Sequence, residues 1–144
     1  MTNNDAPSTF VIFNPAGGNV TTDTRTQLET AFAQCGITYQ FHETAPDEDL
    51  TGVIAAAVAQ EQITLVVAAG GDGTVSAVAN ALVKANQEET DVPFGILPLG
   101  TANLIAQDLG IPLNLEEACT LLANPKQMVT IDAMQIGDDY YFSH

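Results

Sequence analysis

The sequence predicts an α/β fold with an open, mostly parallel sheet and helices on both faces. Strand-like and helix-like segments alternate along most of the chain, which is the order that a parallel sheet requires. One strand segment, Ile63–Ala69, is a continuous apolar run, as expected of a central strand buried on both faces. The 144 residues suffice for one such domain with a sizeable core.

Each element of the first half has its own supporting pattern. The expected strands are rich in β-branched and aromatic residues and lie at Thr9–Phe13, Ile37–His42 and Ile63–Ala69. A helix is expected at Thr21–Gln34, where apolar residues recur at helical spacing. A second helix is expected at Asp47–Gln60, which opens with three acids that favour a helix N-terminus. The polar residues 1–8 are expected to be disordered.

The second half continues the alternation and then changes in character. A helix is expected at Thr74–Lys84, followed by a strand at Phe94–Leu97. Two further helices are expected at Ala102–Leu109 and Leu115–Leu122. Short strands with a turn at Gly137–Asp139 are expected afterwards, at Met128–Ala133, Met134–Ile136 and Tyr140–Phe142. We therefore assign residues 9–126 to the α/β domain. Residues 127–144 are read as the first strands of, or the crossover to, a β-rich domain of a longer protein.

The charge of the chain excludes some classes of partner. Three Lys+Arg stand against 18 Asp+Glu, a net charge of -15, so a basic stripe for nucleic acid is excluded and a basic membrane patch is disfavoured. The start does not resemble a secretory signal, and no apolar stretch is long enough for a transmembrane segment. A cytoplasmic protein is expected, with Cys35 and Cys119 as incidental thiols.

The four strands of the α/β domain end in loops that suit phosphate. The loops are Asn14–Asn19, Glu43–Thr44, Gly70–Thr74 and Gly100–Asn103. Their glycines allow close backbone approach and positive φ, and the helices that follow would direct N–H groups to the same place. Because ligands of such sheets bind at the carboxyl ends of the strands, these loops predict a phosphate-binding edge.

Single residues of these loops also have plainer interpretations. Thr74 and Thr101 stand where helix N-caps stand, and Asn14-Pro15 is typical of a turn. Asp72 differs, because an acid between glycines after an apolar strand has no obvious structural role. It is therefore expected to be a partner for Mg²⁺ or for a substrate hydroxyl. His42 and His144, the only histidines, do not suggest a hydrolase triad.

The motif Gly70-Gly71-Asp72-Gly73-Thr74, with Asn14-Pro15 before it and Leu97–Asn103 after it, resembles the diacylglycerol kinase catalytic domain family. This superfamily includes bacterial lipid kinases and sphingosine kinases, and it is related to NAD kinases and phosphofructokinases. The resemblance extends from about Thr9 to Phe142. The chain departs from the family pattern at four positions: Gly17 replaces a Ser, Ser76 and Ala77 replace Asn-Glu, and Leu104 replaces an Asp.

The resemblance implies the ATP-binding domain of a kinase that phosphorylates a diacylglycerol-like or sphingoid-like lipid. By motif position, Asp72 would be the catalytic residue that organises Mg-ATP or the acceptor. The residues that would bind the nucleotide are Asn14, Pro15, Ala16, Gly17, Gly18, Thr44, Gly70, Gly71, Asp72, Gly73, Thr74, Val75, Ser76, Thr101 and Asn103. The general base and most Mg²⁺ ligands would lie in a following domain that also binds the lipid. The chain alone is therefore predicted to be inactive.

Two alternatives remain open from the sequence. One is a NAD or sugar kinase of the same superfold. The other is a nucleotide-binding module without phosphoryl transfer, which the departures at Gly17, Ala77 and Leu104 favour. Peripheral membrane contact of the full-length protein and a homodimer also remain open. Because the basic residues Arg25, Lys84 and Lys126 fall outside the four loops, backbone N–H groups, hydroxyls and Mg²⁺ are expected to hold phosphate.

Overall fold

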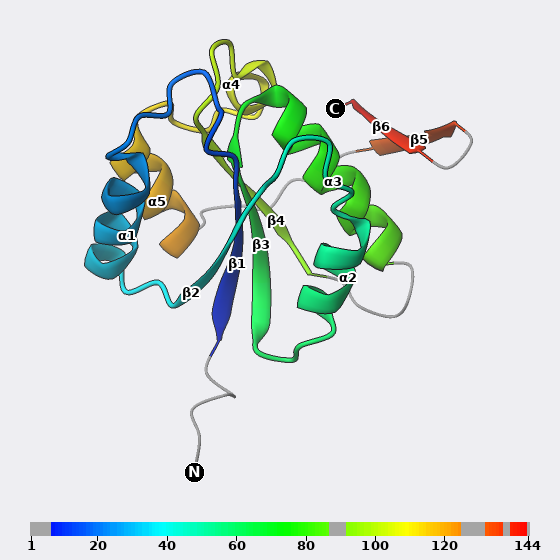
Figure 1. Cartoon of the computed structure of the whole chain (residues 1–144), viewed down its shortest axis with the longest axis horizontal. Helices are drawn as coiled ribbons and strands as arrows, with labels where there is room; N and C mark the ends of the chain where they lie inside the picture. The colour runs from blue at the N-terminus through cyan, green and yellow to red at the C-terminus, as the bar shows by residue number, and fades with distance from the viewer. Residues whose placement is uncertain (1–6, 87–91, 125–131, 137–138, 144) are drawn as a thin grey trace.

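The computed structural model describes residues 7–86, 92–124, 132–136 and 139–143. Its main feature is a parallel four-stranded sheet with strand order β2-β1-β3-β4 (Figure 1). The strands are β1 (Ser8–Phe13), β2 (Tyr39–Glu43), β3 (Ile63–Gly70) and β4 (Phe94–Pro98). All three strand pairs are parallel, which confirms the fold class predicted from the alternation of elements.

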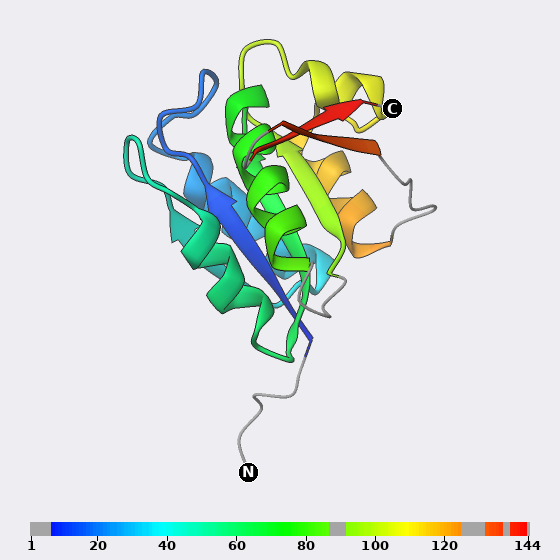
Figure 2. The same ribbon diagram turned by 90° about the vertical axis from the view of Figure 1, so that its right-hand side faces the viewer.

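Helices cover both faces of this sheet. They are α1 (Thr24–Cys35), α2 (Thr51–Val58), α3 (Asp72–Asn86), α4 (Leu104–Asp108) and α5 (Leu115–Ala123). Helices α1 and α5 pack on one face, and α2 and α3 pack on the other (Figures 1 and 2). Because all four strands are parallel, they begin at one edge of the domain and end at the opposite edge, where the loops that lead into the helices lie.

The core is divided between the two faces by the alternation of side chains along the central strands. In β3, Val66 and Ala68 belong to the cluster under α2 and α3, whereas Val67 and Ala69 belong to the cluster under α1 and α5. These four residues are fully buried, as the continuous apolar run predicted.

Cys119 lies in the second cluster as a free thiol, and burial raises its pKa to about 11.

Several element boundaries differ from the predicted ones. Ser8, assigned to the disordered N-terminus, is the buried first residue of β1. Helix α1 begins at Thr24 instead of Thr21, because the Thr24 hydroxyl accepts a hydrogen bond from the Thr21 N–H at 2.8 Å and forms a turn there. Helix α2 begins at Thr51 instead of Asp47, whose φ of 60° is incompatible with a helix. The three acids thus belong to a loop.

After the α/β domain, an antiparallel hairpin of β5 (Asp132–Ile136) and β6 (Asp139–Ser143) lies beside α3 (Figure 2). The sequence predicted a break between Ala133 and Met134, but both belong to β5. The predicted strand residues 128–131 and turn residues 137–138 lie outside the described residues, as do residues 1–6 of the predicted disordered start. Within the described part of the chain, no helix has the length and apolar character needed to cross a membrane.

Candidate phosphate-binding site

Asn14 joins the loop after β1 to the start of α3. Its N–H donates to the Ala69 carbonyl at 3.0 Å, which continues the pairing of β1 with β3. Its Nδ2 donates to the Thr74 hydroxyl at 3.1 Å, and its Oδ1 accepts from the Ala16 N–H at 2.9 Å. The side chain therefore fixes the fold of its own loop and its position against α3.

The loop after β4 is tied to the same assembly. Asn19 donates from its N–H to the Leu99 carbonyl at 2.9 Å and from Nδ2 to the Gly100 carbonyl at 2.7 Å. The Leu99 N–H in turn donates to the Gly70 carbonyl at 2.9 Å. The loops after β1, β3 and β4 thus form one hydrogen-bonded unit, as their shared sheet edge predicted.

The glycines of these loops allow close contact between neighbouring chain segments. A Cβ on Gly71 would lie 3.0 Å from the Gly100 Cα, and a Cβ on Gly100 would collide with the Gly71 Cα. A Cβ on Gly70 would lie 2.7 Å from the Thr74 side chain, and one on Gly18 would collide with the Thr101 hydroxyl. The glycines of these loops do not have positive φ, because the positive-φ glycines among the described residues are Gly36 and Gly110.

The N-terminus of α3 presents free backbone donors. The first bond of the helix runs from the Val75 N–H to the Gly71 carbonyl at 2.9 Å. The N–H groups of Asp72, Gly73 and Thr74 precede it and have no acceptor in the described part of the chain. Gly73 is exposed, and a Cβ there would meet nothing within 4 Å. An anion can therefore approach donors that carry the positive end of the helix dipole.

Asp72 has a structural role that the sequence did not reveal. Its Oδ2 accepts from the Leu104 N–H at 2.9 Å, and its Oδ1 accepts from the Ile105 N–H at 3.0 Å. The carboxylate thereby caps the first turn of α4 from a different helix. The expectation that Asp72 lacks a structural role is wrong, although each oxygen keeps a lone pair for a further partner.

The two predicted N-cap threonines do not cap helices. Thr74 is already the third residue of α3, and α4 begins only after Asn103, whose φ is 55°. Asn103 is buried and folds back on Gly100, accepting from its N–H and donating to its carbonyl, each at 2.8 Å. This loop conformation moves the start of α4 two residues past the predicted Ala102 and leaves Thr101 exposed.

The predicted site residues differ in how accessible they are. The exposed ones are Pro15, Ala16, Gly18, Gly73, Ser76 and Thr101. The half-buried ones are Asn14, Gly17, Thr44, Gly71, Asp72 and Thr74, and the buried ones are Gly70, Val75 and Asn103. Val75 packs in the core with Val78 and its N–H is bonded within the helix, so it supports the site from behind.

The described basic residues, Arg25 on α1 and Lys84 at the end of α3, do not belong to the strand-end loops. Arg25 donates to the Glu43 carboxylate at 2.6 Å and lies 4.9 Å from the centre of the Phe41 ring. Lys84 is in the last turn of α3, at the opposite end from Gly73. Lys126 is outside the described residues. No group of three or more side chains suited to a metal ion occurs in the described part of the chain.

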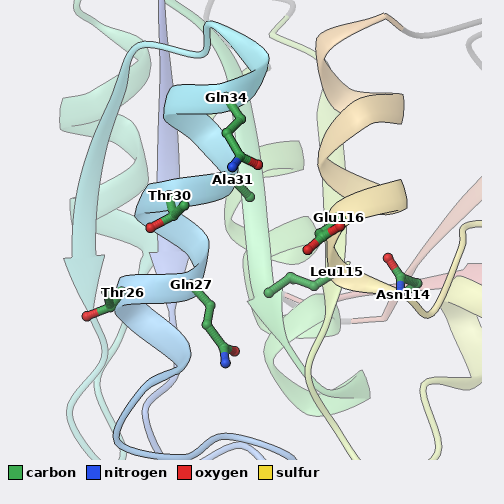
Figure 3. A pocket seen from close by; sticks show the side chains of 8 residues that line it. All are labelled: Thr26, Gln27, Thr30, Ala31, Gln34, Asn114, Leu115 and Glu116. Atoms are coloured by element: carbon green, nitrogen blue, oxygen red, sulfur yellow. The ribbon is translucent and has the colours of Figure 1, made fainter.

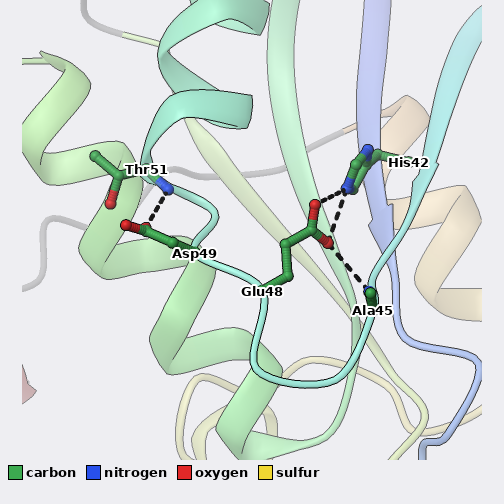
Figure 4. A network of polar contacts seen from close by, with 5 residues as sticks. All are labelled: His42, Ala45, Glu48, Asp49 and Thr51. Carbon is green, nitrogen blue, oxygen red and sulfur yellow. Dashed lines mark hydrogen bonds and ion pairs between the residues drawn. The ribbon is translucent and has the colours of Figure 1, made fainter.

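A polar network that the sequence did not indicate lies in the loop after β2 (Figure 4). The His42 Nε2 donates to the two Glu48 carboxylate oxygens at 3.1 and 3.0 Å, and the Ala45 N–H donates to Oε1 at 3.1 Å. These donors, the Ala45 N–H first, hold the pKa of Glu48 below its ordinary value. The neighbouring Asp49 accepts from the Thr51 N–H at 2.9 Å, which lowers its pKa.

A surface hollow of about 430 Å³ lies between α1 and α5 (Figure 3). Its lining is mostly polar and consists of Thr26, Gln27, Thr30, Ala31, Gln34, Asn114, Leu115 and Glu116. None of these residues belongs to the four strand-end loops, so the hollow is separate from the phosphate-binding edge. No pattern in the sequence indicated it.

Comparison with known proteins gives agreeing results at the levels of sequence and fold. The family model described as the diacylglycerol kinase catalytic domain matches residues 8–136. The probable lipid kinase YegS-like of Yersinia enterocolitica is 46% identical over 88 residues, 61% of this chain and 28% of that protein. Its Yersinia pestis counterpart is 41% identical over 80 residues, 56% of this chain and 26% of that protein.

The fold has solved counterparts as well. A diacylglycerol kinase structure from Bacillus anthracis superposes with a TM-score of 0.78 at 24% sequence identity and covers 98% of this chain. The superposition uses 47% of that structure, so the chain spans about half of the protein it resembles. At this identity the likeness establishes the fold alone.

Proposed function

The chain belongs to the diacylglycerol kinase catalytic domain family, and on that premise we propose that it forms the ATP-binding part of a lipid kinase. The enzyme would transfer the γ-phosphate of ATP to the hydroxyl of a diacylglycerol-like or sphingoid-like lipid. Its family supports the use of ATP, and its curated relatives carry the name of lipid kinases. Activity, substrate and partners of the whole protein are part of the proposal, because the chain spans only part of those relatives.

One observation carries the nucleotide-binding part of this proposal. The free N–H groups at the start of α3 face an open space at Gly73, and three cross-linked loops surround this helix end. Phosphoryl transfer depends on positioning and charge neutralisation more than on covalent chemistry. A rigid set of backbone donors meets the first requirement without any basic side chain.

The predicted binding residues receive different roles in this proposal. Backbone N–H groups of Gly73 and Thr74 would hold phosphate oxygens, with hydroxyls from Thr44, Ser76 and Thr101 at the edge. The loop Pro15–Gly18, exposed except at the half-buried Gly17, would border the nucleotide on the β1 side. Four residues would keep the loops in place through the contacts described above: Asn14, Gly70, Gly71 and Asn103.

The donor set at Asp72 is compatible with Mg²⁺. Magnesium in kinase sites uses one or two carboxylates together with phosphate oxygens and water, and each Asp72 oxygen accepts only one hydrogen bond from the protein. When bound, Mg²⁺ would neutralise charge on the phosphates. Asp72 itself would hold α4, and with it the loop that carries Thr101, against the start of α3.

The remaining parts of the reaction are proposed to come from outside this domain. The general base and the lipid site would lie in a second, β-rich domain, so residues 1–144 alone would bind ATP without phosphorylating a lipid. Contact with a membrane surface would come from that lipid-binding part, and a homodimer is compatible with the proposal. A cytoplasmic location is inferred from the use of ATP as donor.

A second candidate function is nucleotide binding without transfer. Leu104, which replaces the aspartate common at this family position, is 61% exposed and directly follows the loop that carries Thr101. A lipid acceptor screen with labelled ATP and the full-length protein separates the two functions. NAD⁺ as an additional acceptor tests the related NAD kinase alternative.

Calorimetry with Mg-ATP tests the nucleotide site directly on the 144-residue chain. A side chain at Gly73 would tilt toward the N-terminus of α3, so Gly73→Val is expected to weaken binding more than about tenfold. Gly52→Val is the matched control, because Gly52 is also an exposed helical glycine and a Cβ there would likewise meet nothing within 4 Å. Chelation of Mg²⁺ should also abolish binding. A wild-type chain that does not bind Mg-ATP would contradict the proposal.

A further inference from the structure

The loop Thr44–Leu50 connects the edge strand β2 to α2 and begins at the candidate site. The Thr44 N–H donates to the Phe13 carbonyl at 2.9 Å, so Thr44 lies beside the point where Asn14 leaves β1. The loop has no regular secondary structure, and Asp47 within it has a φ of 60°. Its conformation must therefore be fixed by contacts other than those of a helix or a sheet.

Glu48 supplies those contacts from the middle of the loop (Figure 4). Its carboxylate accepts from the His42 ring on β2 at 3.0 Å and from the Ala45 N–H at 3.1 Å. Its own N–H donates to the Ala45 carbonyl at 3.2 Å. The side chains of His42 and Glu48 are 29% and 25% exposed, so the pair is less screened by water than a fully exposed ion pair.

These bonds hold the chain on both sides of Thr44. His42 lies two residues before it and Ala45 directly after it, and both are bonded to the same carboxylate. The Thr44 hydroxyl has no hydrogen-bond partner among the residues that the structure describes. We propose that Glu48 and His42 form a clamp that positions the Thr44 hydroxyl for a phosphate group of the nucleotide. This inference rests on the proposed function.

The other charges near the clamp have partners of their own. Glu43 alternates to the opposite face of β2 and pairs with Arg25. Asp49 accepts from the Thr51 N–H, and Lys84 acts on it electrostatically. The Ala45 N–H and His42 hold the pKa of Glu48 below its ordinary value, so the carboxylate is ionised at neutral pH. The clamp therefore persists at the pH of a nucleotide-binding assay.

A double-mutant cycle between Glu48 and Thr44 tests the clamp, with affinities measured by NMR titration of Mg-ATP. Glu48→Ala and Thr44→Val are each expected to weaken Mg-ATP about three- to tenfold, the equivalent of about one hydrogen bond. The double variant should bind no more weakly than Thr44→Val alone, because Glu48 would act only through Thr44. Adenosine, which has no phosphate, should bind all four proteins equally.

Conservative and neighbouring variants separate positioning from a loss of structure. Glu48→Gln keeps one acceptor oxygen and should recover part of the affinity. His42→Phe removes the ring donor to Glu48 and replaces Glu48→Ala, with the same expected loss of affinity, if Glu48→Ala does not fold. Asp49 lies in the same loop but contacts Thr51 and neither His42 nor Ala45. The variant Asp49→Ala should therefore bind Mg-ATP with the affinity of the wild type.

Failure of the clamp and failure of the nucleotide site give different results. Additive losses, an equal loss for adenosine, or wild-type affinity in Glu48→Ala each overturn the clamp while the proposed nucleotide site stands. A wild-type chain that does not bind Mg-ATP overturns the proposed function, and the clamp falls with it.

Discussion

Two connections between a strand and a helix at the same sheet edge are built in opposite ways. Between β3 and α3 a single residue, Gly71, makes the turn, and α3 begins at the next position. Between β2 and α2 the chain needs Thr44–Leu50, and side chains hold it. The first connection is shaped by backbone contact between glycines, and the second by one carboxylate with its donors.

Because of this difference, the two connections leave different polar groups available to a ligand. The short turn leaves backbone N–H groups of α3 free, because no side chain or loop residue reaches them in the described structure. The long loop uses its polar groups internally, on Glu48 and Asp49. The β3–α3 turn is therefore suited to bind an anion, and the β2–α2 loop is suited to position a neighbouring hydroxyl.

The largest expected effect comes from breaking the glycine contact of the short turn. In Gly100→Ala the new methyl group would collide with the Gly71 Cα, and neither backbone segment can move without displacing a strand end. We expect the free energy of unfolding to fall by about 3 kcal/mol, at the upper end of typical overpacking costs. Urea denaturation of the wild type and the variant measures the difference.

Gly52→Ala is the control for this substitution, because its new methyl group meets nothing within 4 Å. Replacing a helical glycine by alanine should leave stability unchanged or raise it by up to about 1 kcal/mol. Equal stabilities of Gly100→Ala and wild type would show that the turn tolerates a side chain. The proposed reason for two glycines at this crossing would then be wrong.

The sequence predicted the short turn far better than the long loop, and the reason is physical. The apolar run of β3 and the glycines after it are local signals, so the strand and the following helix could be located, although the helix begins at Asp72 and not at the predicted Thr74. The partners of Glu48, which are His42 and Ala45, are six and three positions away but depend on the irregular fold of the loop. The partners of Asp72 are set by tertiary structure. Asp72 meets Leu104, 32 positions later, and no periodicity relates the two.

The same limit explains the errors in the predicted site. Thr74 and Thr101 have the residue type of a helix cap, but the boundary of α3 follows from packing against Gly100, and that of α4 from the fold of Asn103. Val75 belongs to the predicted motif by position, yet its side chain lies on the core face of α3. Motif membership predicted that these loops meet at one edge of the sheet, without showing which atoms face outward.

An intermediate effect is expected at Asp72, which links the short turn to α4. Asp72→Ala leaves the Leu104 and Ile105 N–H groups without their acceptor, so we expect the free energy of unfolding to fall by about 1–3 kcal/mol. Asp72→Asn keeps one acceptor oxygen and should lose less. Thermal unfolding of the two variants measures both values, and stabilities equal to wild type would mean that the capping bonds contribute nothing.

The smallest effect is expected in the long loop, and its dependence on pH distinguishes a side-chain contact from a backbone one. Because folding lowers the pKa of Glu48 from 4.5, its stabilising contribution is complete above that value and is lost as the pH falls through the lowered pKa. Wild type should therefore have a slightly higher melting temperature than Glu48→Gln at neutral pH, and the difference should shrink as the pH falls below 4.5 through the lowered pKa of Glu48. Glu61→Gln, at an exposed position outside the network, should melt like wild type across the same range. A difference that persists in acid would mean that the ionised carboxylate does not hold this loop, and the contrast with the β3–α3 turn would disappear.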